Sequence, residues 1–120
     1  MFMTNKEILE QANKAISMGD FEGFLIHCTD NTVWNFLGDR SIRGKEAVRN
    51  WMREIYKIPP EFNVRQMIAE GDFVVALGDI AISENGKKTN QSYCDVWRLE
   101  GGYLAELNAY VVKNNKSSLI

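Results

Sequence analysis

The chain has 120 residues, of which 45% are hydrophobic and 25% are charged, and its formal net charge is −2. This apolar share is enough for the core of one domain, which excludes intrinsic disorder as the main state. The slight acidic excess argues against nucleic-acid binding, and the single histidine excludes a metal site or catalytic pair built from histidines.

The first part of the chain is predicted to be helical. Thr4 and Glu7 form a capping box, in which a hydroxyl and a carboxylate three residues apart satisfy the first backbone N–H groups. The helix that follows is expected to end at Gly19. Asp20 can cap a second helix. Its expected apolar face consists of Phe21, Phe24, Leu25 and Cys28.

The middle of the chain is predicted to contain one strand and one helix. The Asp30-Asn31 pair is typical of a turn, and we expect a short strand over 32–37 after it. A third helix is predicted over 45–57, because apolar residues recur there at helical spacing and Pro59-Pro60 stops it.

From Glu61 onward the hydrophobic pattern changes to a period of two, which indicates strands. Four strands fit, over 61–69, 73–82, 88–99 and 103–112. Between the second and third of them, Asn85-Gly86 is a strong hairpin signal because both residues tolerate a positive φ. This order predicts an α+β fold, with helices on one face of a curved sheet.

The chain is predicted to be a single domain, residues 1–120, with a core of about 4–112 and a loose tail over 113–120. We expect it to be cytoplasmic and to bind no membrane. No apolar run approaches the roughly 18 residues of a membrane span, and the polar start after Met3 is unlike a secretory signal. Cys28 and Cys94 suggest neither a disulfide framework nor a metal site.

Several short motifs occur in an order that resembles a known superfamily. They are Gly19-Asp20-Phe21-Glu22, Asp30–Asn35, Gly44–Val48, Asp95–Leu99, Gly101-Gly102 and Ala109-Tyr110. Together they resemble the nuclear transport factor 2-like superfamily, in particular its SnoaL-like polyketide cyclase and ketosteroid isomerase branches. The resemblance implies a cone-shaped fold, in which three helices pack on a strongly curved, mainly antiparallel sheet around a deep apolar pocket.

The resemblance also implies a partner and a quaternary structure. The expected ligand is a small apolar molecule bound without a cofactor. In this superfamily the outer face of the sheet commonly pairs two protomers, so a homodimer is expected. Asn108 and Tyr110 are predicted to lie on that outer face, because they alternate with the apolar residues of the last strand.

Asp95 is the main candidate for chemistry. It shares one face of its predicted strand with Tyr93 and Trp97, and an acid in apolar surroundings is costly unless it is paired or protonated. The matching position of ketosteroid isomerase holds a neutral acid that donates a hydrogen bond to an oxyanion. Asp95 is therefore predicted to be an acid of raised pKa or a general base. The alternative is an acid paired with an arginine or hydrogen-bonded within the fold.

Asn35 and His27 are the other catalytic candidates. Asn35 matches the general base of the isomerase, but an amide cannot remove a proton. Since Ala12 also replaces the hydroxyl of the isomerase's first helix, steroid isomerisation by that mechanism is disfavoured. Asn35 and Asp95 together resemble limonene epoxide hydrolase, where such a pair helps to activate water, although Tyr93 stands in place of its arginine. His27 is a candidate proton shuttle or a structural residue.

The remaining predicted site residues are apolar or aromatic, and core packing is the alternative interpretation of each. The predicted substrate-binding residues are Tyr93, Trp97, Val33, Trp51, Met52, Tyr56, Leu107, Ala109 and Val111. Asp39 and Arg40 lie near the expected pocket mouth and are interpreted as solvated loop charges.

Three functions remain open at this stage. The first is acid–base chemistry of the isomerase or cyclase type on an apolar cyclic carbonyl compound. The second is a non-catalytic ligand-binding or dimerisation module. The third is activation of water by Asp95 and Asn35, as in an epoxide hydrolase.

Overall fold

The computed structural model describes residues 3–114, and this part of the chain contains three helices and six strands. The helices are α1 (Asn5–Ser17), α2 (Phe21–Leu25) and α3 (Lys45–Ile55). The strands are β1 (Cys28–Phe36), β2 (Arg40–Arg43), β3 (Glu61–Glu70), β4 (Phe73–Glu84), β5 (Lys87–Glu100) and β6 (Tyr103–Lys113). The predicted α+β class is confirmed.

The helix ends follow the predicted chemistry. The backbone N–H of Glu7 donates to Thr4 Oγ1 at 3.2 Å, and the N–H of Thr4 donates to Glu7 Oε1 at 2.8 Å, which completes the capping box. Gly19 follows α1 with φ +77°, a conformation that glycine adopts without strain. The Asp20 carboxylate caps α2 by accepting from the N–H of Gly23 at 2.9 Å. Within residues 3–114, no helix is long and apolar enough to span a membrane.

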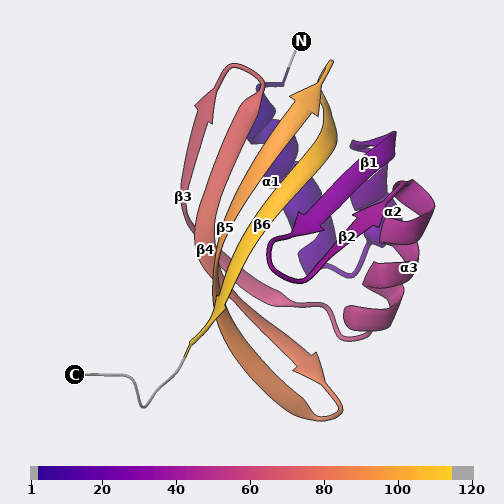
Figure 1. Cartoon of the computed structure of the whole chain (residues 1–120), viewed down its shortest axis with the longest axis vertical. Helices are drawn as coiled ribbons and strands as arrows, with labels where there is room; N and C mark the ends of the chain where they lie inside the picture. The colour runs from indigo at the N-terminus through magenta and orange to yellow at the C-terminus, as the bar shows by residue number, and fades with distance from the viewer. Residues whose placement is uncertain (1–2, 115–120) are drawn as a thin grey trace.

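The six strands form one sheet in the order β2-β1-β6-β5-β4-β3. All neighbours are antiparallel except β1 and β6, which run parallel. Asn85, with φ +52°, and Gly86, with φ +78°, turn the chain between β4 and β5 as predicted. The sheet curves strongly, and the helices lie on its concave side (Figure 1).

The prediction for the segment around β1 is partly wrong. Cys28 begins β1 and does not belong to the apolar face of α2, which ends at Leu25. The predicted turn at Asp30-Asn31 lies inside β1, where the pairing with β6 is irregular between Cys28 and Val33. β2 was not predicted, because its four residues alternate too briefly to give a pattern.

The core lies between the helices and the concave face of the sheet. Its largest fully buried side chains are Phe24, Leu9, Leu25, Met52, Leu99, Leu104, Val48, Val74 and Thr32. Burial of each large apolar side chain contributes about 1.5–3 kcal/mol. The buried Thr32 hydroxyl donates to the carbonyl oxygen of Leu104 at 3.1 Å and so ties β1 to β6.

The predicted tail falls mostly outside the described part of the chain. Lys113 is the last residue of β6, and not part of a tail. Residues 115–120 lie beyond the residues that the structure describes.

Candidate functional site

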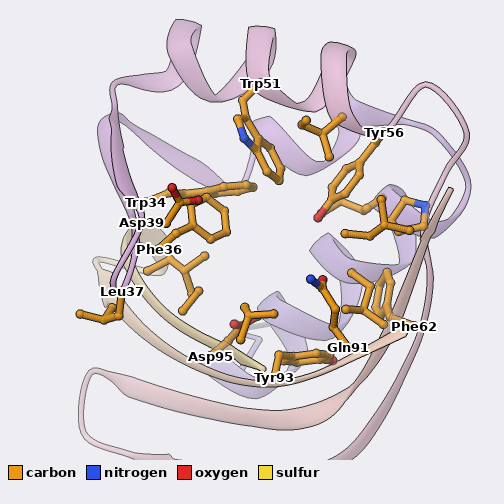
Figure 2. A pocket seen from close by; sticks show the side chains of 18 of the residues that line it. Trp34, Phe36, Leu37, Asp39, Trp51, Tyr56, Phe62, Gln91, Tyr93 and Asp95 are labelled. Carbon is orange, nitrogen blue, oxygen red and sulfur yellow. The ribbon is translucent and has the colours of Figure 1, made fainter. Parts of the chain in front are cut away.

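A cavity of about 460 Å³ opens between the concave face of the sheet and the helices. A volume of this size is typical of sites for small molecules. Trp51 on α3 and Tyr56, which directly follows α3, enter the cavity on the side opposite to Asp95 and Tyr93 on β5 (Figure 2). The predicted site residues that line it are Asp95, Tyr93, Trp97, Trp51, Tyr56, Leu107, Ala109 and Val111.

One wall of the cavity is a cluster of aromatic side chains. Trp51 stacks on Phe36 with ring centroids 5.1 Å apart and an angle of 29° between the planes. Trp34 meets both of them edge to face, at 5.7 Å from Trp51 and 6.2 Å from Phe36. Rings held in this way contribute large apolar surfaces of fixed orientation, so the wall suits a flat apolar molecule.

Three carboxyl groups line the cavity, and of these Asp95 is half-buried whereas Asp39 and Glu84 are exposed. Alternation along β5 turns Asp95 to the concave face together with Tyr93 and Trp97, as predicted. Among residues 3–114 it has no ion-pair or hydrogen-bond partner, so the alternative of an arginine-paired acid finds no support in this part of the chain. Burial raises the pKa of Asp95 from 3.8 to about 7, because the apolar walls disfavour the carboxylate.

Two tyrosines accompany this acid. Burial, and next the negative charge of Asp95, raise the pKa of Tyr93 to about 12. The same two causes, in the same order, raise the pKa of Tyr56. Both phenols are therefore protonated near neutral pH. Gly78 makes room for Tyr93, because a Cβ there would collide with the Tyr93 hydroxyl and the Asn63 carbonyl oxygen.

Asn35 is placed differently from the prediction. It alternates with Trp34 and Phe36, which line the cavity, and therefore lies on the outer face of the sheet. Its amide nitrogen donates to Asn108 Oδ1 at 3.0 Å and to Glu106 Oε2 at 3.4 Å, and its Oδ1 accepts from Ser41 at 2.7 Å. The sheet separates Asn35 from Asp95, so the predicted water-activating pair does not form.

Three further predicted residues lie outside the cavity lining. Val33 shares the outward face of β1 with Asn35. Met52 is fully buried in the core, behind the cavity wall. His27 lies between α2 and β1, where its carbonyl oxygen accepts from the N–H of Leu104 at 2.7 Å, and its side chain does not reach the cavity.

The structure adds lining residues that the sequence reasoning did not select. The most informative is Gln91, whose amide points into the cavity (Figure 2). Its parity with Asp95 on β5 was the signal that could have identified it. The others include Asn13, Ile16, Leu37, Ile55, Pro60, Phe62, Ile80 and Ile82.

Four charged residues besides Asp95 also line the cavity. Asp39 and Arg40 form an exposed ion pair at 3.6 Å, and Glu84 and Lys113 also line the cavity. Asp39 and Arg40 are exposed, as the interpretation as solvated charges predicts, and both border the cavity, as expected from their position near its mouth. The site thus combines an apolar interior with two acidic and two basic side chains, whose formal charges cancel.

The chain matches the family model of the SnoaL-like domain over residues 9–107. A search of curated proteins finds no match.

Solved structures of the same fold have low sequence identity to this chain. An NTF2-like protein of unknown function from Cytophaga hutchinsonii is 21% identical, with a TM-score of 0.80 over 93% of both chains. An epoxide hydrolase of M. tuberculosis, similar to limonene epoxide hydrolase, is 18% identical, with a TM-score of 0.82 over 90% of this chain and 82% of its own. A candidate SnoaL-like polyketide cyclase from Shewanella denitrificans is 13% identical, with a TM-score of 0.82 over 90% of both chains.

Proposed function

The chain belongs to the SnoaL-like domain family, and we propose that its cavity binds a small, largely apolar cyclic carbonyl compound and performs acid–base chemistry on it. The observation that carries the proposal is Asp95, a carboxyl group without a partner among residues 3–114 and with a pKa of about 7. A group of this pKa exists in both forms near neutral pH and can both accept and return a proton.

The reaction follows from the chemistry of a carbonyl compound. Ionised Asp95 takes a proton from the carbon next to the carbonyl group, and the electron pair of that C–H bond moves toward the carbonyl oxygen to form an enolate. In a β,γ-unsaturated carbonyl compound this charge also extends over the C=C double bond to the γ-carbon. Protonated Asp95 then returns the proton to the γ-carbon, the double bond moves into conjugation with the carbonyl group, and the result is an isomerisation. In a cyclisation, the enolate carbon instead attacks a second carbonyl group, whose oxygen takes the proton from Asp95.

The aromatic wall supports the proposal that the ligand is apolar and cyclic. Trp34, Phe36 and Trp51 present ring faces and edges to the cavity, and flat rings pack well on such surfaces. The cyclase and epoxide hydrolase names of structural neighbours are consistent with cyclic or ring-forming substrates.

Deuterium exchange into 2-tetralone, a bicyclic ketone, tests the proposal without knowledge of the natural substrate. We expect the protein to accelerate loss of the α-proton NMR signals in D₂O, with a rate that saturates in ketone and rises between pH 6 and 8. The rise follows from ionisation of Asp95, whose pKa is about 7. Acetate at the same carboxylate concentration is the control. Exchange no faster than in acetate, with 2-tetralone still bound, would favour the non-catalytic binding module instead.

We also propose that the outer face of the sheet pairs two copies of the chain. The exposed apolar side chains on this face are Ile68, Phe73, Tyr110 and Val112. Their burial against a second copy would remove them from water, which is favourable.

Light scattering tests the dimer. The expected mass is twice that of one chain, and Tyr110→Glu is expected to reduce it to that of one chain, because a charge would enter an apolar contact. Tyr103→Glu is the matched control, since Tyr103 is equally exposed but lies at the β5–β6 turn. A monomeric wild-type protein would contradict the proposal.

A further inference from the structure

Tyr56 is a polar residue of the cavity lining whose ring is held in place by aromatic neighbours. It directly follows α3, and its backbone N–H donates to the carbonyl oxygen of Met52 at 2.8 Å. Its ring packs edge to face on Trp51 at 5.2 Å and tilted against Phe21 at 6.4 Å. Only 9% of the residue is exposed. These contacts fix the direction in which the phenol points.

The Tyr56 hydroxyl points into the cavity (Figure 2). In the described part of the chain it makes no hydrogen bond to side chain or backbone. Buried polar groups nearly always have a hydrogen-bond partner, because an unpaired one costs about 1–3 kcal/mol. A hydroxyl that is fixed in this direction without an internal partner is therefore available to a polar atom of a ligand.

Tyr56 and Asp95 face the same space from opposite sides (Figure 2). They are close enough for the Asp95 charge to raise the pKa of Tyr56 further, beyond the effect of burial. The phenol stays protonated at neutral pH, so it acts as a hydrogen-bond donor. Gln91 also points into this space, and its amide N–H₂ group can donate as well. Tyr56 differs in that its ring is packed against Trp51 and Phe21, which fixes the direction of the O–H group that can donate to a carbonyl oxygen.

We propose that the Tyr56 hydroxyl donates a hydrogen bond to the carbonyl oxygen of the bound ligand, and so orients the neighbouring carbon toward Asp95. The inference rests on the proposed function, because it takes the ligand to be a carbonyl compound. When Asp95 removes the proton, negative charge develops on that oxygen. A donor already in place stabilises this charge more than it stabilises the neutral carbonyl, and removal of one such donor costs about 10²–10³-fold in rate.

Binding of two matched probes isolates the hydrogen bond. The probes are 2-tetralone and tetralin, a hydrocarbon of nearly the same shape without the oxygen, and equilibrium dialysis measures both. Tyr56→Phe keeps the ring and its packing. We expect it to weaken 2-tetralone binding about tenfold, the effect of one lost hydrogen bond, and to change tetralin binding less than twofold. Tyr103→Phe is the control, because Tyr103 lies at the β5–β6 turn and does not line the cavity.

The outcomes separate a ligand contact from a structural role. Equal weakening of both probes, or no weakening of either, would overturn the inference. Failure of the wild-type protein to bind either probe would overturn the proposed function and the inference with it. Where the wild-type protein exchanges the α-protons of 2-tetralone, Tyr56→Phe is expected to lower kcat about 100-fold and to raise KM about tenfold. Selective weakening of 2-tetralone binding without any exchange would support the contact and contradict only the catalytic function.

Discussion

Asp95→Asn is expected to slow α-proton exchange of 2-tetralone at least 100-fold, to a rate that no longer depends on pH between 6 and 8. General acid–base groups contribute about 10²–10⁴-fold, and an amide can neither accept nor return the proton. The side chain keeps nearly the same shape in the same aromatic surroundings, so binding of 2-tetralone is expected to change much less than the exchange rate. NMR exchange rates at several ketone concentrations separate the two effects.

Asp79→Asn is the matched control for this substitution. Asp79 lies on the outer face of the sheet, where it accepts from Ser92 at 2.9 Å and pairs with Arg65 at 3.3 Å. Its loss is expected to leave exchange unchanged. Exchange by Asp95→Asn within threefold of wild type would show that another group carries the proton.

The stability of the wild-type protein is expected to fall as the pH rises from about 4 to about 7. In this window the folded state keeps a proton on Asp95, whose pKa is about 7 in the fold against 3.8 ordinarily, while the unfolded chain has lost it. The folded state therefore binds more protons, and stability decreases with pH and levels off above 7. A shift of this size corresponds to about 4 kcal/mol.

Urea unfolding at pH 4, 5.5, 7 and 8 measures this dependence, and Asp95→Asn provides the reference. The charged groups at the cavity, Asp39, Arg40, Glu84 and Lys113, are present in both proteins, as are the neutral phenols Tyr56 and Tyr93. The difference between the two curves thus reports Asp95 alone. We expect the variant to gain stability relative to wild type as the pH rises to 8. Parallel curves would mean that the Asp95 carboxylate is solvated or paired in solution.

The helix cap and the hairpin turn could be predicted from the sequence because each depends on residues that are neighbours in the chain. The capping box at Thr4 and Glu7 and the Asn85-Gly86 turn involve neighbours in the chain, and the structure contains both. The Asp30-Asn31 pair also looked like a local turn, but it lies in a strand. Bonds to distant residues hold this strand, such as that from the Thr32 hydroxyl to Leu104. Such bonds give no signal in a single segment.

The alternation of side chains along a strand predicted correctly which residues face the cavity. The position of a residue in a family motif did not. Alternation placed Asp95, Tyr93 and Trp97 on the cavity side of β5. Asn35 was assigned through the resemblance alone, although its neighbours Trp34 and Phe36 are the large aromatic residues of that strand. Because side chains alternate between faces, two aromatic residues facing inward place the residue between them outside.

The parallel pairing of β1 with β6 has a consequence for how the chain acquires its cavity. Trp34 lies beside Leu107, 73 residues further along (107 − 34), whereas β3 to β6 are joined by short turns. Closing a long loop costs more entropy than closing a hairpin. The meander of β3 to β6 can therefore form before β1 pairs with β6. Trp34 and Phe36 join Asp95 and Trp97 in the cavity lining only when β1 pairs with β6. The cavity is therefore complete only once β1 has paired with β6, and the β3–β6 meander alone does not enclose it.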